Sequence, residues 1–218
     1  MSEFGLTLIA RLAHSDELES AVADFQRWSE AGWKADGLTW TPYRRGQRHV
    51  TVFSLVRSQP KPLSLHWLPA DFPEMIRRLG DWGKTGTPAE FCFETVVRDR
   101  HIVSVHAPRP PSGVVELWTR WKTDMDSIVT ERRAGWEVTN PKGDNLFQVK
   151  YPAYKVYGTI GHLTPAKSGT FRSSWSPVTV RVSSLSLVSY AGRTLDDIRG
   201  EAELSGSADA ILRSIGLT

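Results

Sequence analysis

The spacing of apolar residues along the first half of the chain predicts a mixture of strands and helices. A strand is indicated where apolar residues run together or alternate with polar ones, and a helix where they recur every three or four positions. Ser15 is a suitable helix N-cap, and Leu18, Val22 and Phe25 follow it at helical spacing. The elements predicted for this half are strands over 6–12, 38–43, 49–56, 91–97 and 101–105 and helices over 16–32 and 72–82.

The second half of the chain predicts the same two kinds of element. A proline-rich break at 108–111 separates the halves. The elements predicted after it are a helix over 112–135, short strands over 136–138 and 147–150, a strand over 154–164, a strand over 178–188 with a bulge at 183–184, and a helix over 208–215. This order predicts one α+β domain over 1–218, built from two lobe-forming halves, 1–108 and 109–218.

Two of the predicted strands carry a histidine and a threonine two positions apart: His49 with Thr51, and His162 with Thr164. Side chains at i and i+2 of a strand point to the same face, so each motif places an imidazole beside a hydroxyl. Two such pairs that face each other can hold a phosphate between two proton-transfer groups. Histidine suits this role because its pKa of about 6.5 lets a neutral and a protonated imidazole coexist near neutral pH.

Composition and charge limit the classes of protein that this sequence encodes. The chain has 218 residues, a net charge of +3 and one cysteine, Cys92, which excludes an intramolecular disulfide and a cysteine-based zinc site. Its apolar runs are too short to span a bilayer, and its first residues lack the pattern of a secretory signal. We therefore expect a cytoplasmic protein that does not enter a membrane.

Basic and aromatic residues near the two motifs are candidates for contact with a substrate. Arg45 and Arg48 come just before His49, where they can form an electropositive rim that attracts a phosphate; a solvated loop is the alternative. Aromatic side chains near the motifs can stack on a nucleobase, with packing in the core as the alternative. The aromatic candidates are Tyr43, Tyr157 and Trp175.

The order of elements and the two motifs resemble the two-histidine (2H) phosphoesterases, also called the LigT-like family. In layout the resemblance covers residues 6–190. The first motif, His49-Val50-Thr51-Val52, has the character of the family's motif inside a strand. The second departs from the family's pattern, because Gly161 stands before His162 where the family usually has proline, and Pro165 follows Thr164.

The resemblance implies a bilobal α+β fold in which two antiparallel sheets with flanking helices surround a central groove. It implies that His49 and His162 act as general base and general acid, in an order that the sequence does not determine. Thr51 and Thr164 would then bind the phosphate, and hydrolysis would need neither a metal nor another cofactor. The implied substrate is a nucleotide or RNA end with a 2′,3′-cyclic phosphate, a 2′,5′ linkage or a cyclic oligonucleotide; no protein partner is indicated.

Two other classes of protein fit the same sequence. A module of this fold can bind RNA or a nucleotide without cleaving it. Alternatively, the chain is an intracellular protein-interaction partner, such as a toxin-neutralising protein, in which the histidines have no catalytic role. Turnover of nucleotides separates an enzyme from a binding module, and the placement of the two histidines separates both from the interaction protein.

Overall fold

The computed structural model describes residues 4–59, 62, 64–65, 72–85, 89–131, 156–166, 170–192 and 197–217. The helices in these ranges are α1 (Asp16–Ala35), α2 (Phe72–Thr85), α3 (Ser112–Glu131) and α4 (Ala208–Ser214). The strands are β1 (Phe4–Arg11), β2 (Thr39–Pro42), β3 (His49–Gln59), β4 (Ala89–Asp99), β5 (Ile102–Ala107), β6 (Val156–Thr164), β7 (Thr170–Val182), β8 (Ser186–Ala191) and β9 (Ile198–Glu203). The short strands predicted over 136–138 and 147–150 lie outside the described residues.

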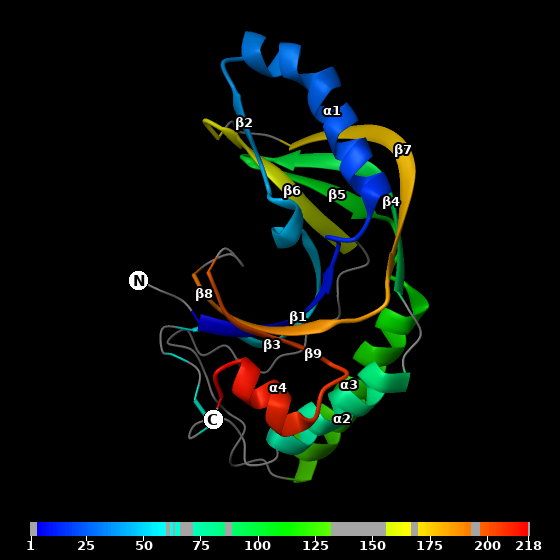
Figure 1. Ribbon diagram of the computed structural model, residues 1–218, viewed down its shortest axis with the longest axis vertical. Coiled ribbons are helices and arrows are strands. Elements are labelled where there is room, and N and C mark those ends of the chain that lie inside the picture. Colours follow the sequence, from blue (N-terminus) through cyan, green and yellow to red (C-terminus); the bar gives the residue numbers. More distant parts are fainter. Residues whose placement is uncertain are drawn as a thin grey trace.

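The described strands form one antiparallel sheet, which confirms the α+β class (Figure 1). The order along the sheet is β7-β4-β5-β6-β3-β1-β8-β9, and β2 pairs with β6 beside β3. The expected division into two separate sheets is not seen. Among the described residues, the ladder between β3 and β6 consists of a single residue pair, Val50 with Gly158. This ladder joins two parts of the sheet: one contains β7, β4, β5 and β6, and the other contains β3, β1, β8 and β9.

The helices pack at two ends of this sheet and bury one hydrophobic core. Figure 1 shows α1 alongside β7 at one end, and α2, α3 and α4 gathered near β1, β3 and β9 at the other. Apolar side chains from strands and helices meet in one cluster, which includes Leu18, Val50, Phe91, Leu117 and Ile211. None of the described helices has the length and apolarity needed to cross a membrane.

The first helix begins where the sequence predicts. The Ser15 hydroxyl accepts a hydrogen bond from the Leu18 N–H at 3.1 Å, which satisfies one of the amides that a helix start leaves open. Asp16 and Glu17 lie in the first turn, where the helix dipole favours acidic side chains. The helix continues past the predicted end at Gly32 to Ala35.

The single strand predicted over 178–188 is wrong. Residues up to Val182 belong to β7, which pairs with β4, whereas residues from Ser186 belong to β8, which pairs with β1. At Ser183 and Ser184 the chain therefore leaves one end of the sheet and enters the other, instead of continuing with a bulge. One consequence is that strands from before and after residue 108 lie next to each other in the sheet.

Candidate active site

Both histidine–threonine motifs lie on the face of the sheet that points away from the hydrophobic core. In β3, Val50 and Val52 are buried in the core, while His49 is half-buried and Thr51 is exposed. Strand pairing places further polar residues on this same side. We call this surface the histidine face; it comprises His49, Thr51, Tyr157, Thr159, His162, Thr164, Thr39, Thr41, Ser104 and His106.

A bulge in β6 brings the second motif onto this face. Val103 of β5 pairs with Gly161 and Ser104 pairs with Thr159, so Ile160 is an extra residue in β6. Ile160 and Gly161 are both on the core side, after which His162 is half-buried and Thr164 is exposed. If residues 159–162 alternated strictly, without the bulge, His162 would point toward the core.

The register places the two histidines on neighbouring strands. Val50 pairs with Gly158 on the core side, so Thr159 lies next to His49 on the opposite face. Two steps of the β5–β6 ladder, about 7 Å at the usual rise of a strand, separate Thr159 from His162. The two motifs therefore come from distant parts of the sequence and meet on one surface.

Two glycines allow the strands to approach at this point. A Cβ on Gly158 would lie 2.9 Å from Leu12 Cδ1 and 3.3 Å from the carbonyl oxygen of His49. A Cβ on Gly161 would overlap the indole of Trp40 and lie 2.8 Å from the carbonyl oxygen of Thr41. Glycine before His162, where the resembled family usually has proline, thus permits β2 to pack directly on β6.

His49 is held in a defined orientation by the turn that precedes it. Its Nδ1 lies 2.7 Å from the carbonyl oxygen of Gln47. A carbonyl oxygen only accepts, so Nδ1 carries the hydrogen in this contact and Nε2 is the nitrogen that takes up or releases a proton. Gln47 ends a short 3-10 turn over Arg45–Gln47, which separates β2 from β3.

His162 lies among aromatic and histidine rings. The ring of Tyr43 meets it edge-on at 5.0 Å between centroids, and the ring of His101 lies 5.4 Å away. The Thr164 hydroxyl is 3.5 Å from the carbonyl oxygen of Thr39, a distance at the limit of a hydrogen bond. The predicted candidate Tyr43 is therefore brought to the second histidine.

Tyr157 lies on the same face, on the β5 side of β6. The residue is 54% exposed, and its ring stacks on the ring of His106 with 5.4 Å between the centroids. The Ser104 hydroxyl lies 2.8 Å from Nε2 of His106 and fixes that ring in turn. An exposed aromatic ring that is held in place by stacking on one of its faces can stack on a nucleobase with the other.

The other three predicted contact residues lie elsewhere. Arg48 is 4% exposed, and its guanidinium is bound by the carboxylate of Glu19 and the carbonyl oxygen of Tyr43, so it forms no rim for a substrate. Trp175 packs against the core and donates to the carbonyl oxygen of Phe93 at 3.2 Å. Arg45 is exposed, but it donates to the carbonyl oxygen of Ala13 and to Asp16.

Sequence reasoning missed several polar residues near the histidines. Arg11, at the end of β1, pairs in register with His49, and Glu201 of β9 binds Arg11. His101 lies at the β4–β5 turn beside His162. The alternation of uncharged and charged residues over 198–203 is a signal for β9, but no local pattern shows that β9 approaches β1.

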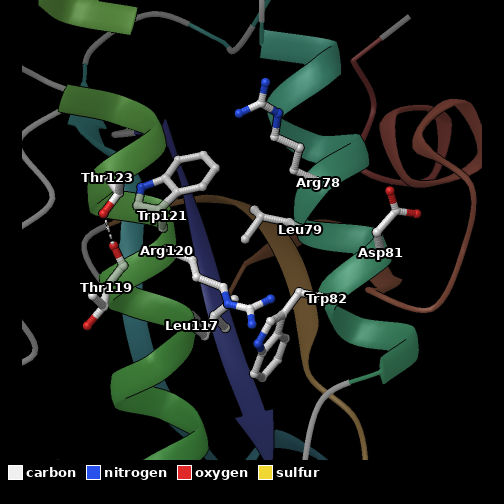
Figure 2. Close-up of a pocket in the computed structure, with 9 residues that line it drawn as sticks. All are labelled: Arg78, Leu79, Asp81, Trp82, Leu117, Thr119, Arg120, Trp121 and Thr123. Carbon is white, nitrogen blue, oxygen red and sulfur yellow. Dashed lines mark hydrogen bonds between the residues drawn. The ribbon is translucent and has the colours of Figure 1, made fainter. Parts of the chain in front are cut away.

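A cavity of about 530 Å³ lies away from the histidine face, between α2 and α3. Figure 2 shows Leu79 and Trp82 of α2 facing Leu117, Arg120 and Trp121 of α3. Leu79, Leu117 and Trp121 belong to the core cluster, which is on the other side of the sheet from His49 and Thr51. Among the described residues, no group of three or more histidine, cysteine, aspartate or glutamate side chains is placed to hold a metal ion.

No family model matches the chain, and no curated protein matches it in sequence. Among solved structures, the fold is similar to that of TT0787 of Thermus thermophilus, with a TM-score of 0.51 and 14% sequence identity over 93% of this chain and 98% of that one. A second crystal structure, described as that of a phosphoesterase, has a TM-score of 0.49 and 10% identity over 94% of this chain and 99% of that one.

The likeness to TT0787 extends over nearly all of both chains and concerns the fold. At 14% identity this likeness is one of fold and assigns no activity to the chain. What the face with the two histidines does is a separate question, and it depends on the residues themselves.

Proposed function

We propose that this chain is a phosphodiesterase that hydrolyses a nucleotide phosphodiester with His49 and His162 as an acid–base pair. The observation that carries the proposal is the meeting of two histidine–threonine motifs on one polar face, on neighbouring strands. One imidazole takes a proton from the attacking water or hydroxyl, and the other gives a proton to the leaving oxygen. No metal is needed for this chemistry, because both proton transfers are carried by side chains.

Thr51 and Thr164 are the proposed ligands of the phosphate. Their hydroxyls share a face with the histidines and are exposed, so they can donate to the non-bridging oxygens. These oxygens gain negative charge in the transition state, and a fixed donor stabilises that charge. The two parts of the sheet then serve as two lobes that contribute one motif each, with the substrate between them.

The proposed substrate is a nucleotide or an RNA end with a 2′,3′-cyclic phosphate, a 2′,5′ linkage or a cyclic oligonucleotide. The support for a nucleotide is the pair of aromatic rings on this face: Tyr43 beside His162, and Tyr157 exposed above His106. Either ring offers a flat apolar surface to a base. We place the reaction in the cytoplasm, because a single cysteine gives no reason to expect an oxidising compartment.

The test is turnover of a panel of these nucleotides by the full chain in the presence of EDTA. We expect His49→Ala and His162→Ala each to lower kcat by about 10²–10⁴, the usual contribution of a general acid or base. Thr51→Val should lower kcat by about 10², while Thr51→Ser, which keeps the hydroxyl, should retain most of the activity. The matched control is His14→Ala, since His14 is exposed and lies outside the histidine face.

Circular dichroism and thermal unfolding of each variant separate loss of chemistry from loss of fold. Nucleotide binding without hydrolysis by the parent chain would favour the binding module instead. Full activity of either histidine variant would exclude the acid–base pair.

A further inference from the structure

Arg11 and Glu201 form an ion pair across the sheet, next to the first histidine. The Arg11 Nε donates to one Glu201 carboxylate oxygen at 2.9 Å, and Nη2 binds the other oxygen. The two residues are on β1 and β9, which β8 separates, so the pair reaches over an intervening strand. Both side chains are less than one-third exposed, at 18% and 32%. A bidentate pair of this kind fixes the plane of the guanidinium as well as its position.

Glu201 is ionised in this setting. Burial raises the pKa of its carboxyl, but the hydrogen bond and charge of Arg11 outweigh burial, and the net pKa is lowered. A hydrogen bond with Ser186 and the charge of His49 lower the pKa of Glu201 further. The carboxylate is therefore a permanent anchor for Arg11 at neutral pH.

The third donor of Arg11 links this anchor to the turn before His49. Nη1 donates to the carbonyl oxygen of Gly46 at 3.0 Å. The next carbonyl along the chain, that of Gln47, is the one that accepts from Nδ1 of His49 at 2.7 Å. Apart from Gly46 itself and its two chain neighbours, no described atom lies within 4 Å of the position that a Cβ on Gly46 would take.

Arg45, within the turn, forms its own contacts with the segment between β1 and α1. It donates to the carbonyl oxygen of Ala13 at 2.5 Å and to Asp16 at 2.6 Å. The Arg45–Asp16 pair is largely exposed, at 47% and 85%, and exposed pairs of this kind contribute little. Of these two arginines, Arg11 is the better-shielded anchor.

We propose that the Arg11–Glu201 pair is a positioning device for His49. The pair holds the turn over Arg45–Gln47 so that the Gln47 carbonyl oxygen faces Nδ1 of His49. In the neutral imidazole the hydrogen then stays on Nδ1, and Nε2 is the nitrogen that accepts or donates the catalytic proton. Arg11 acts through the turn and does not bind the substrate phosphate. The catalytic consequence rests on the proposed function, whereas the effect on the tautomer of His49 does not.

The tautomer of His49 is the direct test. We expect ¹⁵N–¹H NMR of the neutral imidazole to show the hydrogen on Nδ1 in the parent chain. Arg11→Met should give a mixture of tautomers at His49, and so should Glu201→Gln, which keeps the size of the side chain and all of Arg11. The matched control is Arg199→Met, because Arg199 is also an arginine of the strands β1 and β9 and forms an exposed pair with Asp197 at 2.7 Å.

The kinetic test uses whichever nucleotide the parent chain hydrolyses. Arg11→Met should lower kcat about tenfold and leave KM within about twofold, since the loss is in the orientation of a proton-transfer group. A rise in KM at unchanged kcat would show that Arg11 binds the substrate, and an unchanged His49 tautomer in a folded Arg11→Met variant would also overturn the proposal. If the parent hydrolyses nothing, the proposed function fails, and the NMR result still decides the role of Arg11.

Discussion

Arg48 and His49 are consecutive residues with opposite environments. The imidazole of His49 is on the polar face, whereas the guanidinium of Arg48 is buried and bound to Glu19 of α1. The sequence shows a basic residue before a strand, which favours an exposed position. The burial depends on a carboxylate 29 residues away, so it could not be predicted from the local pattern.

Removing the partner of this buried arginine should destabilise the fold. We expect Glu19→Gln to lower the free energy of unfolding by about 3 kcal/mol, because it leaves the charge of Arg48 buried without an anion. The measurement is urea unfolding at pH 7, followed by tryptophan fluorescence. The control is Glu90→Gln, since the Glu90–Arg181 pair is exposed and 3.6 Å apart, and its loss should cost less than about 0.5 kcal/mol. Equal effects of the two changes would contradict this account.

At the scale of elements, local signals predict where a helix starts and whether a segment is helix or strand. They do not predict which strands pair with each other. The cap at Ser15 and the helix after it follow from side-chain chemistry within four residues, and the structure confirms both. The pattern over 178–188 predicts one continuous strand because valine or leucine recurs on both sides of Ser183 and Ser184. The point at which β7 ends and the chain crosses to pair with β1 depends on the positions of distant strands. The periodicity of apolar residues carries no information about those strands.

The packing of α2 against the end of β9 depends on a glycine inside a helix. A Cβ on Gly83 would lie 2.5 Å from Leu204 Cβ and 2.9 Å from the Leu204 carbonyl carbon. By contrast, apart from its chain neighbours and the backbone of its own helix, no described atom lies within 4 Å of the Cβ position of Gly32 in α1. Both residues are helical glycines, so they form a matched pair.

The same substitution should therefore have opposite effects at these two positions. Gly32→Ala should raise the free energy of unfolding by about 0.5–1 kcal/mol, because alanine restricts the unfolded chain and favours a helix. Gly83→Ala should lower it by about 1–3 kcal/mol, since the added methyl group forces α2 away from Leu204. Thermal and urea unfolding of the two variants measure both changes, and a stabilised Gly83→Ala variant would show that α2 packs differently.

At the scale of the whole molecule, the two ends of the chain lie in adjacent parts of one sheet. β1 pairs with β8, β8 pairs with β9, and the ion pair of Arg11 with Glu201 joins residues 190 positions apart. The fold class could be predicted, because element types follow from local spacing. The two histidine–threonine motifs could also be found in the sequence. The contact between Arg11 of β1 and Glu201 of β9 could not, because no local pattern predicts that these strands lie close together.

The ion pair between Arg11 and Glu201 should give stability a defined pH dependence. The folded-state pKa of Glu201 is lowered, so its contribution is fully present above its unfolded pKa of about 4.3 and is lost as pH falls through the folded value. We expect Glu201→Gln to cost about 1 kcal/mol at pH 7 and to match the parent chain at the lowest pH where both still fold. Urea unfolding across pH 3–7 measures the difference, and a difference that is constant with pH would show that the carboxylate charge is not involved.

The extra residue at Ile160 has a consequence for which deletions β6 can accept. Deletion of Ile160 would leave Gly161 alone between Thr159 and His162, which is the regular alternation of a strand, so the imidazole would stay on the polar face and Leu163 in the core. Deletion of Leu163, which lies outside the bulge, would instead turn Thr164 toward the core. The gene can therefore lose a codon at the bulge and keep the second motif in contact with water, but not one codon further on.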